Sequence, residues 1–265
     1  MMGRALLFVL LVGVLSACNT ILPTATVVDN GVQDILWIGD DQILTGPLDM
    51  QTLLFIELAG GGALLQMERI INPRFNLSFA FDESKSDLGR AITENDLLII
   101  QGFGLQRDFS DEEFEDNANS WVTTPRTKGK DVMVFYPWFT RVDSEETKNH
   151  LDELFHKVVW QQNLTMVPVG PAWEAARKAR PNIQLYASDG IHPSPAGVYL
   201  TACVFYASLT GESPLDNPVY TSIGYDSPDE IVKLDGETIE FLQMIAWETI
   251  SDYLKKDEFQ VIIKQ

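Results

Sequence analysis

The chain of 265 residues is poor in several residue types on which whole protein classes depend. Its two cysteines, Cys18 and Cys203, can form one disulfide at most, which excludes a small secreted fold held together by disulfides. Its 19 basic residues stand against 38 acidic ones, and a net charge of −19 repels nucleic acid, so we expect no nucleic-acid partner. Only three histidines are available for chemistry that needs an imidazole.

The overall composition is that of a folded domain. Apolar residues make up 45% of the chain and charged residues 22%, which are ordinary globular values and exclude a disordered or low-complexity protein. The length suits one domain with a substantial core.

Residues 1–17 have the features of a signal peptide. One charge, Arg4, precedes an apolar run from Ala5 to Leu15, about half of the roughly 20 residues that span a bilayer. The following Leu-Ser-Ala-Cys resembles the signal of a bacterial lipoprotein, in which cleavage precedes a cysteine that becomes lipidated. The resemblance implies that acyl chains on Cys18 anchor the mature chain in the bacterial cell envelope, outside the cytoplasm. Asn19 is compatible with an outer membrane if the host is Gram-negative; an ordinary secretory signal and a retained anchor are the alternatives.

The rest of the chain divides into a tether, residues 18–33, and one domain, residues 34–265. In the domain, short apolar runs typical of buried strands alternate with amphipathic stretches typical of helices, which predicts an α/β fold with a parallel sheet covered on both faces. We expect strands at 35–38, 64–71, 97–100, 132–136 and 166–169, and helices at 48–58, 145–160, 195–209 and 236–256. The acidic segment 106–119 is predicted to be an exposed surface insertion, with the start of a helix as the alternative.

His192 is the histidine whose surroundings indicate chemistry. His150 and His156 lie six residues apart on different faces of a predicted helix, which suits surface or packing roles. His192 lies in a turn-rich segment three residues after Asp189, and Gly190 lets the chain turn the carboxylate onto the imidazole. Such a pair supplies the base and its orienting group in a nucleophilic triad.

The segment Asp189-Gly-Ile-His192-Pro, continued by residues 197–206 and 211–214, resembles the last conserved block of SGNH/GDSL hydrolases. The first strand and its end, Ile35-Leu-Trp-Ile-Gly-Asp-Asp41, resemble the first block of their bacterial branch, and the likeness extends over residues 34–255. The resemblance implies a three-layer α/β/α sandwich with a central parallel five-stranded sheet, flavodoxin-like, with no cofactor and no metal. It also implies an ester hydrolase whose ligand is a small molecule or a glycan.

In this family a serine after the first strand is the nucleophile, and its N–H joins a glycine and an asparagine in the oxyanion hole. Here Asp41 occupies the serine position, and the first hydroxyl after it is that of Thr45. The second block falls on Pro73, which has no N–H, and on the bulky Arg74. In the third block, Gln101 keeps an amide that can donate.

Magnitudes indicate what Asp41 does to ester hydrolysis. A carboxylate about 4 Å from a developing oxyanion repels it by about 4 kcal/mol at an effective dielectric constant near ~20. This is comparable to the roughly 3 to 4 kcal/mol that one oxyanion donor supplies. We therefore expect a catalytically impaired hydrolase that still binds a ligand in its cleft, with Asp41 and His192 forming a charged pair.

Two other hypotheses remain open. The first is a working esterase or carbohydrate deacetylase in which Asp41 is the nucleophile, or the base for a water, assisted by His192 and Asp189. The second is a divalent-metal site built from Asp40, Asp41, Asp189 and His192, although no metal-ligand spacing supports it.

Further residues have candidate roles with ordinary alternatives. Gly39 and Asp40 end the first strand, where they can contact the oxyanion or substrate, or can stabilise a turn or cap a helix. Trp138 follows the fourth strand and suits ligand stacking and core packing equally. Packing is the simpler role for four other tryptophans, and Cys203 is expected to be a small buried apolar residue. These tryptophans are Trp37, Trp160, Trp173 and Trp247.

Overall fold

A computed structural model describes residues 34–40, 51–52, 66–72, 75, 81–82, 86–104, 108–223 and 231–255. The predicted leader with Cys18, the tether, most of the predicted helix 48–58 and the candidate residues Asp41, Pro73 and Arg74 lie outside these ranges.

Five parallel strands form the central sheet of the described part of the chain. They are β1 (Asp34–Gly39), β2 (Gln66–Ile71), β3 (Leu97–Gln101), β4 (Asp131–Tyr136) and β5 (Thr165–Pro168), in the order β2-β1-β3-β4-β5. All residues of β3 and β5 are buried, and so are all of β1 and β4 after their first residue, whereas the edge strand β2 is partly exposed. Burial on both faces explains why the inner strands are continuous apolar runs. The predicted parallel five-stranded sheet is confirmed.

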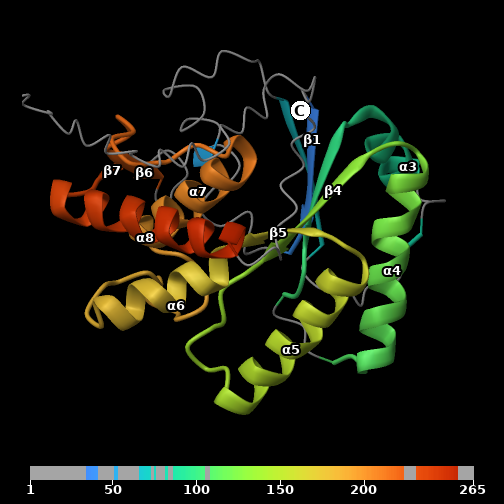
Figure 1. Ribbon diagram of the computed structural model, residues 1–265, viewed down its shortest axis with the longest axis horizontal. Coiled ribbons are helices and arrows are strands. Elements are labelled where there is room, and N and C mark those ends of the chain that lie inside the picture. The colour runs from blue at the N-terminus through green and yellow to red at the C-terminus, as the bar shows by residue number, and fades with distance from the viewer. Residues whose placement is uncertain are drawn as a thin grey trace, which may run out of the picture.

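Helices cover both faces of this sheet (Figure 1). On one side lie α3 (Ser86–Glu94), α4 (Asp111–Thr127) and α5 (Glu145–Gln161), and on the other lie α6 (Val169–Ala179), α7 (Pro195–Thr210) and α8 (Gly236–Lys255). A short antiparallel pair, β6 (Thr221–Ile223) and β7 (Ile231–Lys233), lies beside α7. The architecture is the three-layer α/β/α sandwich that the sequence pattern predicts.

Helix α7 lies inside the molecule, between the sheet and α8. Every residue from Gly197 to Thr210 is buried, and the ring of Phe205 lies 4.4 Å from that of Trp37 and 5.2 Å from that of Phe135, between centroids. A helix that is apolar all round is buried all round. Cys203 lies within it, and burial raises the pKa of its thiol. The prediction of a small buried residue at this position is confirmed.

Two predictions from the sequence are wrong, one on the acidic segment 106–119 and one on Trp160. The acidic segment is no surface insertion: Ser110 and Glu113 form a capping box at the start of α4, and Phe114 and Ala118 are buried against the core. The alternative, a helix start, is confirmed. Trp160 is 79% exposed at the end of α5 rather than packed, whereas Trp37 and Trp173 are fully buried as expected.

Candidate active site

The strand order reverses between β1 and β3, and the carboxyl ends of these two strands define the first half of the site. In open parallel sheets, ligands bind outside the carboxyl ends of the strands at such a reversal. Gly39 ends β1, with Asp40 directly after it, and Gln101 ends β3. The two polar side chains that sequence analysis placed in separate family blocks therefore meet at one point.

Asp40 and Gln101 form a closed hydrogen-bonded pair. The backbone N–H of Asp40 donates to Oε1 of Gln101 over 2.9 Å, and Nε2 of Gln101 donates to Oδ1 of Asp40, also over 2.9 Å. The same Nε2 donates to the carbonyl oxygen of Phe103 over 2.9 Å. Because an amide has two hydrogens, both are used inside the protein. The prediction that Gln101 donates to an oxyanion is therefore not met in this geometry.

The backbone encloses the Asp40 carboxylate from the other side. A Cβ added to Gly104 would lie 2.2 Å from Oδ2 of Asp40 and 2.5 Å from the carbonyl oxygen of Phe75, so only glycine fits there. Asp40 and Gln101 are both 0% exposed. Gly39 is also buried, and its carbonyl oxygen accepts from the N–H of Asn72 over 2.9 Å. In this structure Asp40 joins the ends of β1 and β3 and does not face solvent.

Asp189 and His192 form the second half of the site, and here the predicted pair is present. Nδ1 of His192 lies 2.5 Å from Oδ2 of Asp189, and the side chains are 13% and 34% exposed respectively. Oδ1 of Asp189 accepts from the N–H groups of Ile191 over 2.8 Å and of His192 over 3.0 Å. Partial burial works to raise the pKa of Asp189, but these hydrogen bonds outweigh it and hold the pKa below its usual value.

Local turn chemistry explains the shape of this loop. Gly190 has a φ of 72°, a left-handed conformation that favours glycine, and its N–H donates to the carbonyl oxygen of Ala187 over 3.1 Å. The N–H of Ala187 donates to the carbonyl oxygen of His192 over 2.8 Å, which closes the turn. Ser194 then caps α7, with Pro195 at the first position of the helix.

The loop is fastened to the segment 137–141 that comes after β4. Nε1 of Trp138 donates to the carbonyl oxygen of Ile191 over 2.9 Å, and the N–H of Arg141 donates to that of Gly190, also over 2.9 Å. The hydroxyl of Tyr186 donates to the carbonyl oxygen of Phe139 over 2.6 Å. Sequence analysis missed Tyr186 and Arg141, because no local pattern links residues 47 or more positions apart.

Trp138 is 1% exposed and stacks on Trp173, with ring centroids 4.4 Å apart and an angle of 8° between the planes. Of its two candidate roles, the structure therefore shows packing. The ring lies under the Asp189–His192 loop and touches the site through Ile191.

A polar hollow opens at the same edge of the sheet. Its volume is about 560 Å³, and its walls include Tyr136 at the end of β4, Phe139 after it, Asp152 and His156 of α5, and Tyr253 of α8. The hydroxyl of Tyr136 donates to Oδ1 of Asp152, and burial together with this bond raises the pKa of Tyr136. Hydrogen-bond acceptors, hydrogen-bond donors and aromatic rings thus line the same hollow.

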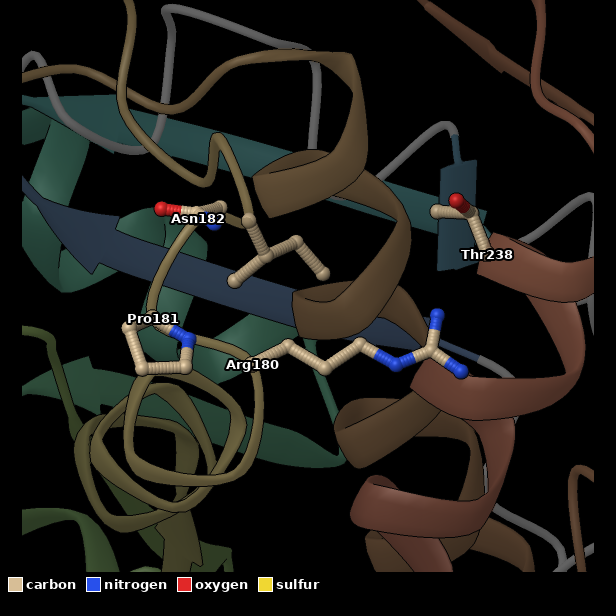
Figure 2. A pocket seen from close by; sticks show the side chains of 5 residues that line it. Arg180, Pro181, Asn182 and Thr238 are labelled. Atoms are coloured by element: carbon tan, nitrogen blue, oxygen red, sulfur yellow. The ribbon is translucent and has the colours of Figure 1, made fainter.

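A second hollow, of about 380 Å³, lies between the end of α6 and the start of α8. Figure 2 shows Arg180 extending from the end of α6 toward α8, where Thr238 lies. The guanidinium of Arg180 is 4.0 Å from the ring centre of Phe241 and 3.3 Å from Oε1 of Glu237. None of the residues that sequence analysis placed in the site lines this hollow or the polar hollow.

Neither a metal cluster nor a membrane-spanning helix occurs in the described part of the chain. Among the described residues, no group of three or more histidine, cysteine, aspartate or glutamate side chains is placed to hold a metal ion. Within the same ranges, no helix has the length and apolar character to cross a bilayer.

The sheet order, the reversal at β1 and β3, and the Asp-x-x-His loop between α6 and α7 agree with the α/β fold of SGNH hydrolases. No protein-family model and no curated protein matches the chain. Solved structures do. A protein of the DUF4886 family from Bacteroides uniformis matches with a TM-score of 0.61 and 16% identity, over 87% of this chain and 98% of that one.

Two hydrolases are also similar. A protein assigned as an SGNH hydrolase from Slackia heliotrinireducens has a TM-score of 0.52 and 17% identity, over 68% of this chain and 100% of that one. A catalytic serine-to-alanine mutant of an acetylxylan esterase from Geobacillus stearothermophilus has a TM-score of 0.57 and 15% identity, over 69% and 95% of the two chains. The chain therefore has the SGNH hydrolase fold.

Proposed function

We propose that this protein is a lipid-anchored SGNH-fold protein of the bacterial cell envelope that hydrolyses esters poorly and binds a small molecule or glycan in its cleft. One observation carries the proposal: both amide hydrogens of Gln101 are used on Asp40 and Phe103. The fold position that would supply an oxyanion donor is thus closed, while the Asp189–His192 pair is kept.

The chemistry of the first block supports weak hydrolysis. The acetylxylan esterase of similar fold was solved as a catalytic mutant that lacks a serine, and the sequence of this chain carries Asp41 at the position that resembles the family's serine. A carboxylate attacks an unactivated ester poorly, and its charge opposes the oxyanion that forms. That position therefore offers His192 no serine hydroxyl to deprotonate.

Ligand binding is supported by the polar hollow beside β4 and β5. Its carboxylate, imidazole and phenol groups suit a ligand rich in hydroxyl groups, and the ring of Tyr253 suits the apolar face of a sugar ring. Among proteins of similar fold, the one from Geobacillus stearothermophilus is an acetylxylan esterase. We therefore expect xylo-oligosaccharides, with or without acetyl groups, to be useful first ligands.

An ester assay tests the proposal. Purified protein is incubated with short-chain aryl esters and acetylated xylo-oligosaccharides, and binding of the same sugars is followed by calorimetry. We expect binding, with turnover near the uncatalysed rate and unchanged in His192→Ala. Turnover at the rate of a serine esterase that His192→Ala abolishes would show that the site is a working one.

The anchor has a separate test. Cells that express the whole chain are labelled with a fatty-acid analogue, and the membrane fraction is compared with that of Cys18→Ser. We expect label and membrane association for the natural chain, and loss of both for the variant. Label on Cys18→Ser, or an unlabelled soluble natural chain, would remove the anchor from the proposal.

A second function is favoured by the geometry of the Asp189–His192 pair. The 2.5 Å contact between Oδ2 and Nδ1 orients the imidazole as in the base and orienting group of a nucleophilic triad, an arrangement that a binding protein does not need. In this alternative Asp41 is the nucleophile, or it activates a water with His192. It predicts ester hydrolysis that survives serine-directed fluorophosphonates and is lost in Asp41→Asn.

A further inference from the structure

The peptide unit between Ile191 and His192 is held from both sides. Its carbonyl oxygen accepts from Nε1 of Trp138 over 2.9 Å, and its N–H donates to Oδ1 of Asp189 over 3.0 Å. Oδ2 of the same carboxylate contacts Nδ1 of His192 at 2.5 Å. A continuous chain of hydrogen bonds thus runs from the Trp138 indole, through one peptide plane and one carboxylate, to the imidazole.

Each bond in such a chain strengthens the next. A donor on a peptide carbonyl polarises the amide and makes its N–H a better donor. The plane of the peptide also fixes the direction from which its N–H meets the carboxylate, and therefore where Oδ2 lies relative to the ring. We infer that Trp138 is a positioning residue that sets the Asp189–His192 geometry through this peptide.

The surroundings of Trp138 hold its N–H in one direction. The indole is 1% exposed and stacks on Trp173 with the planes 8° from parallel, so the ring cannot turn without displacing its neighbour. The loop meets it with little freedom, because the N–H of Arg141 donates to the carbonyl oxygen of Gly190 in the same turn.

Trp173 is a matched control within the same stack. Its Nε1 donates to Oγ1 of Thr201 on α7 over 3.1 Å, and neither atom belongs to the Asp189–His192 loop. Trp138→Phe and Trp173→Phe therefore remove the same indole donor from the same pair of rings. Only Trp138→Phe removes a hydrogen bond to the Asp189–His192 loop.

The experiment observes Asp189 and His192 directly by NMR and does not require turnover. The readouts are the low-field resonance of the proton on Nδ1 of His192 and the pKa of Asp189 from its carboxyl carbon. In Trp138→Phe we expect the resonance to move upfield and broaden, and the pKa of Asp189 to rise toward its usual value, because its N–H donor is weaker. In Trp173→Phe, which keeps an aromatic ring beside Trp138 and the bond of Trp138 to Ile191, we expect a much smaller change in both readouts. Unchanged readouts in a folded Trp138→Phe, or equal changes in the two variants, would overturn the inference.

A second substitution covers the case in which Trp138→Phe does not fold. An isosteric benzothienyl-alanine at position 138 keeps the ring shape and the stack and lacks only the N–H donor. The same upfield shift is expected, and its absence would count against the positioning role. The inference rests on the proposed role of the Asp189–His192 pair, but these readouts do not depend on hydrolysis. A protein with no ester activity can pass this test, and an active one can fail it.

Discussion

The two halves of the site differ in how they meet solvent. At the ends of β1 and β3, Asp40 and Gln101 are 0% exposed and bond to each other. In the loop before α7, Asp189 and His192 bond to each other but keep 34% and 13% of their side chains exposed. Both halves contain a carboxylic acid side chain and a hydrogen-bonding partner, so the chemical groups alone do not set their roles.

The surroundings of each pair decide what it does. A buried carboxylate needs its donors, since leaving it without them costs far more than at the surface. The Asp40–Gln101 pair is therefore committed to holding two strands together. The Asp189–His192 pair is held by a turn and keeps part of both side chains exposed, while Nε2 of His192 itself is buried.

We expect the largest loss of stability when the hydrogen-bonded pair of Asp40 and Gln101 is broken. Gln101→Met keeps the shape but takes the Nε2 donor away from the Asp40 carboxylate. We expect a loss of about 3 kcal/mol in the free energy of unfolding, measured by urea denaturation at neutral pH. The control, Gln161→Met, changes an exposed residue at the end of α5 and should cost less than about 0.5 kcal/mol. Equal losses in the two variants would mean that the buried pair contributes nothing particular.

A smaller loss is expected when the enclosure of Asp40 is disturbed and its bonds are kept. In Gly104→Ala the new Cβ would lie 2.2 Å from Oδ2 of Asp40 and 2.5 Å from the carbonyl oxygen of Phe75. The carbonyl belongs to the backbone and yields little, so we expect a loss of about 2 kcal/mol by the same urea measurement. In Gly236→Ala no atom lies within 4 Å of the added Cβ, and the expected change is within about 0.5 kcal/mol. A tolerated Gly104→Ala would contradict the close packing around Asp40.

The contrast between the two halves of the site also explains which features can be predicted from the sequence. The Asp189–His192 pair lies three residues apart in one turn, and Gly190 supplies the left-handed conformation, so local sequence is enough to predict it. The inner strands are also predictable, because burial on both faces leaves a continuous apolar run.

Long-range contacts are not predictable in this way. The bond between Asp40 and Gln101 joins residues 61 positions apart, and only the parallel pairing of β1 with β3 brings them together. From the sequence alone, the amide of Gln101 is expected to be available as a donor, because no local pattern indicates that Asp40 accepts a hydrogen bond from it. The contact of Tyr186 with Phe139 is missed for the same reason.

Helix α4 shows a different limit. The charges around Asp111 and Glu113 indicate a solvated segment, but Phe114, directly after Glu113, and Ala118, one turn further along, are buried. A helix can be acidic on one face and part of the core on the other, and the net charge of a window averages the two faces. The exposure of Trp160 also depends on where α5 ends relative to its neighbours, which its own sequence does not specify.

The smallest effect is expected in the second half of the site, where only a charge is removed. Asp189→Asn keeps an oxygen to accept from the N–H groups of Ile191 and His192, so the variant should fold and lose little stability at neutral pH. Hydrogen bonds hold the pKa of Asp189 below its usual value in the folded protein, although partial burial opposes them. The carboxylate therefore stabilises the fold above the usual carboxyl pKa of about 3.9, and this contribution is lost as the pH falls through the lower folded value.

The difference between the urea midpoints of the natural chain and Asp189→Asn should therefore shrink as the pH falls below about 4. The matching substitution Asp40→Asn should cost more at neutral pH, because the Asp40 carboxylate is enclosed and accepts from Nε2 of Gln101. A midpoint difference for Asp189→Asn that grows as the pH falls below about 4 would mean that the carboxyl is held in its protonated form, contrary to the geometry of its three hydrogen bonds.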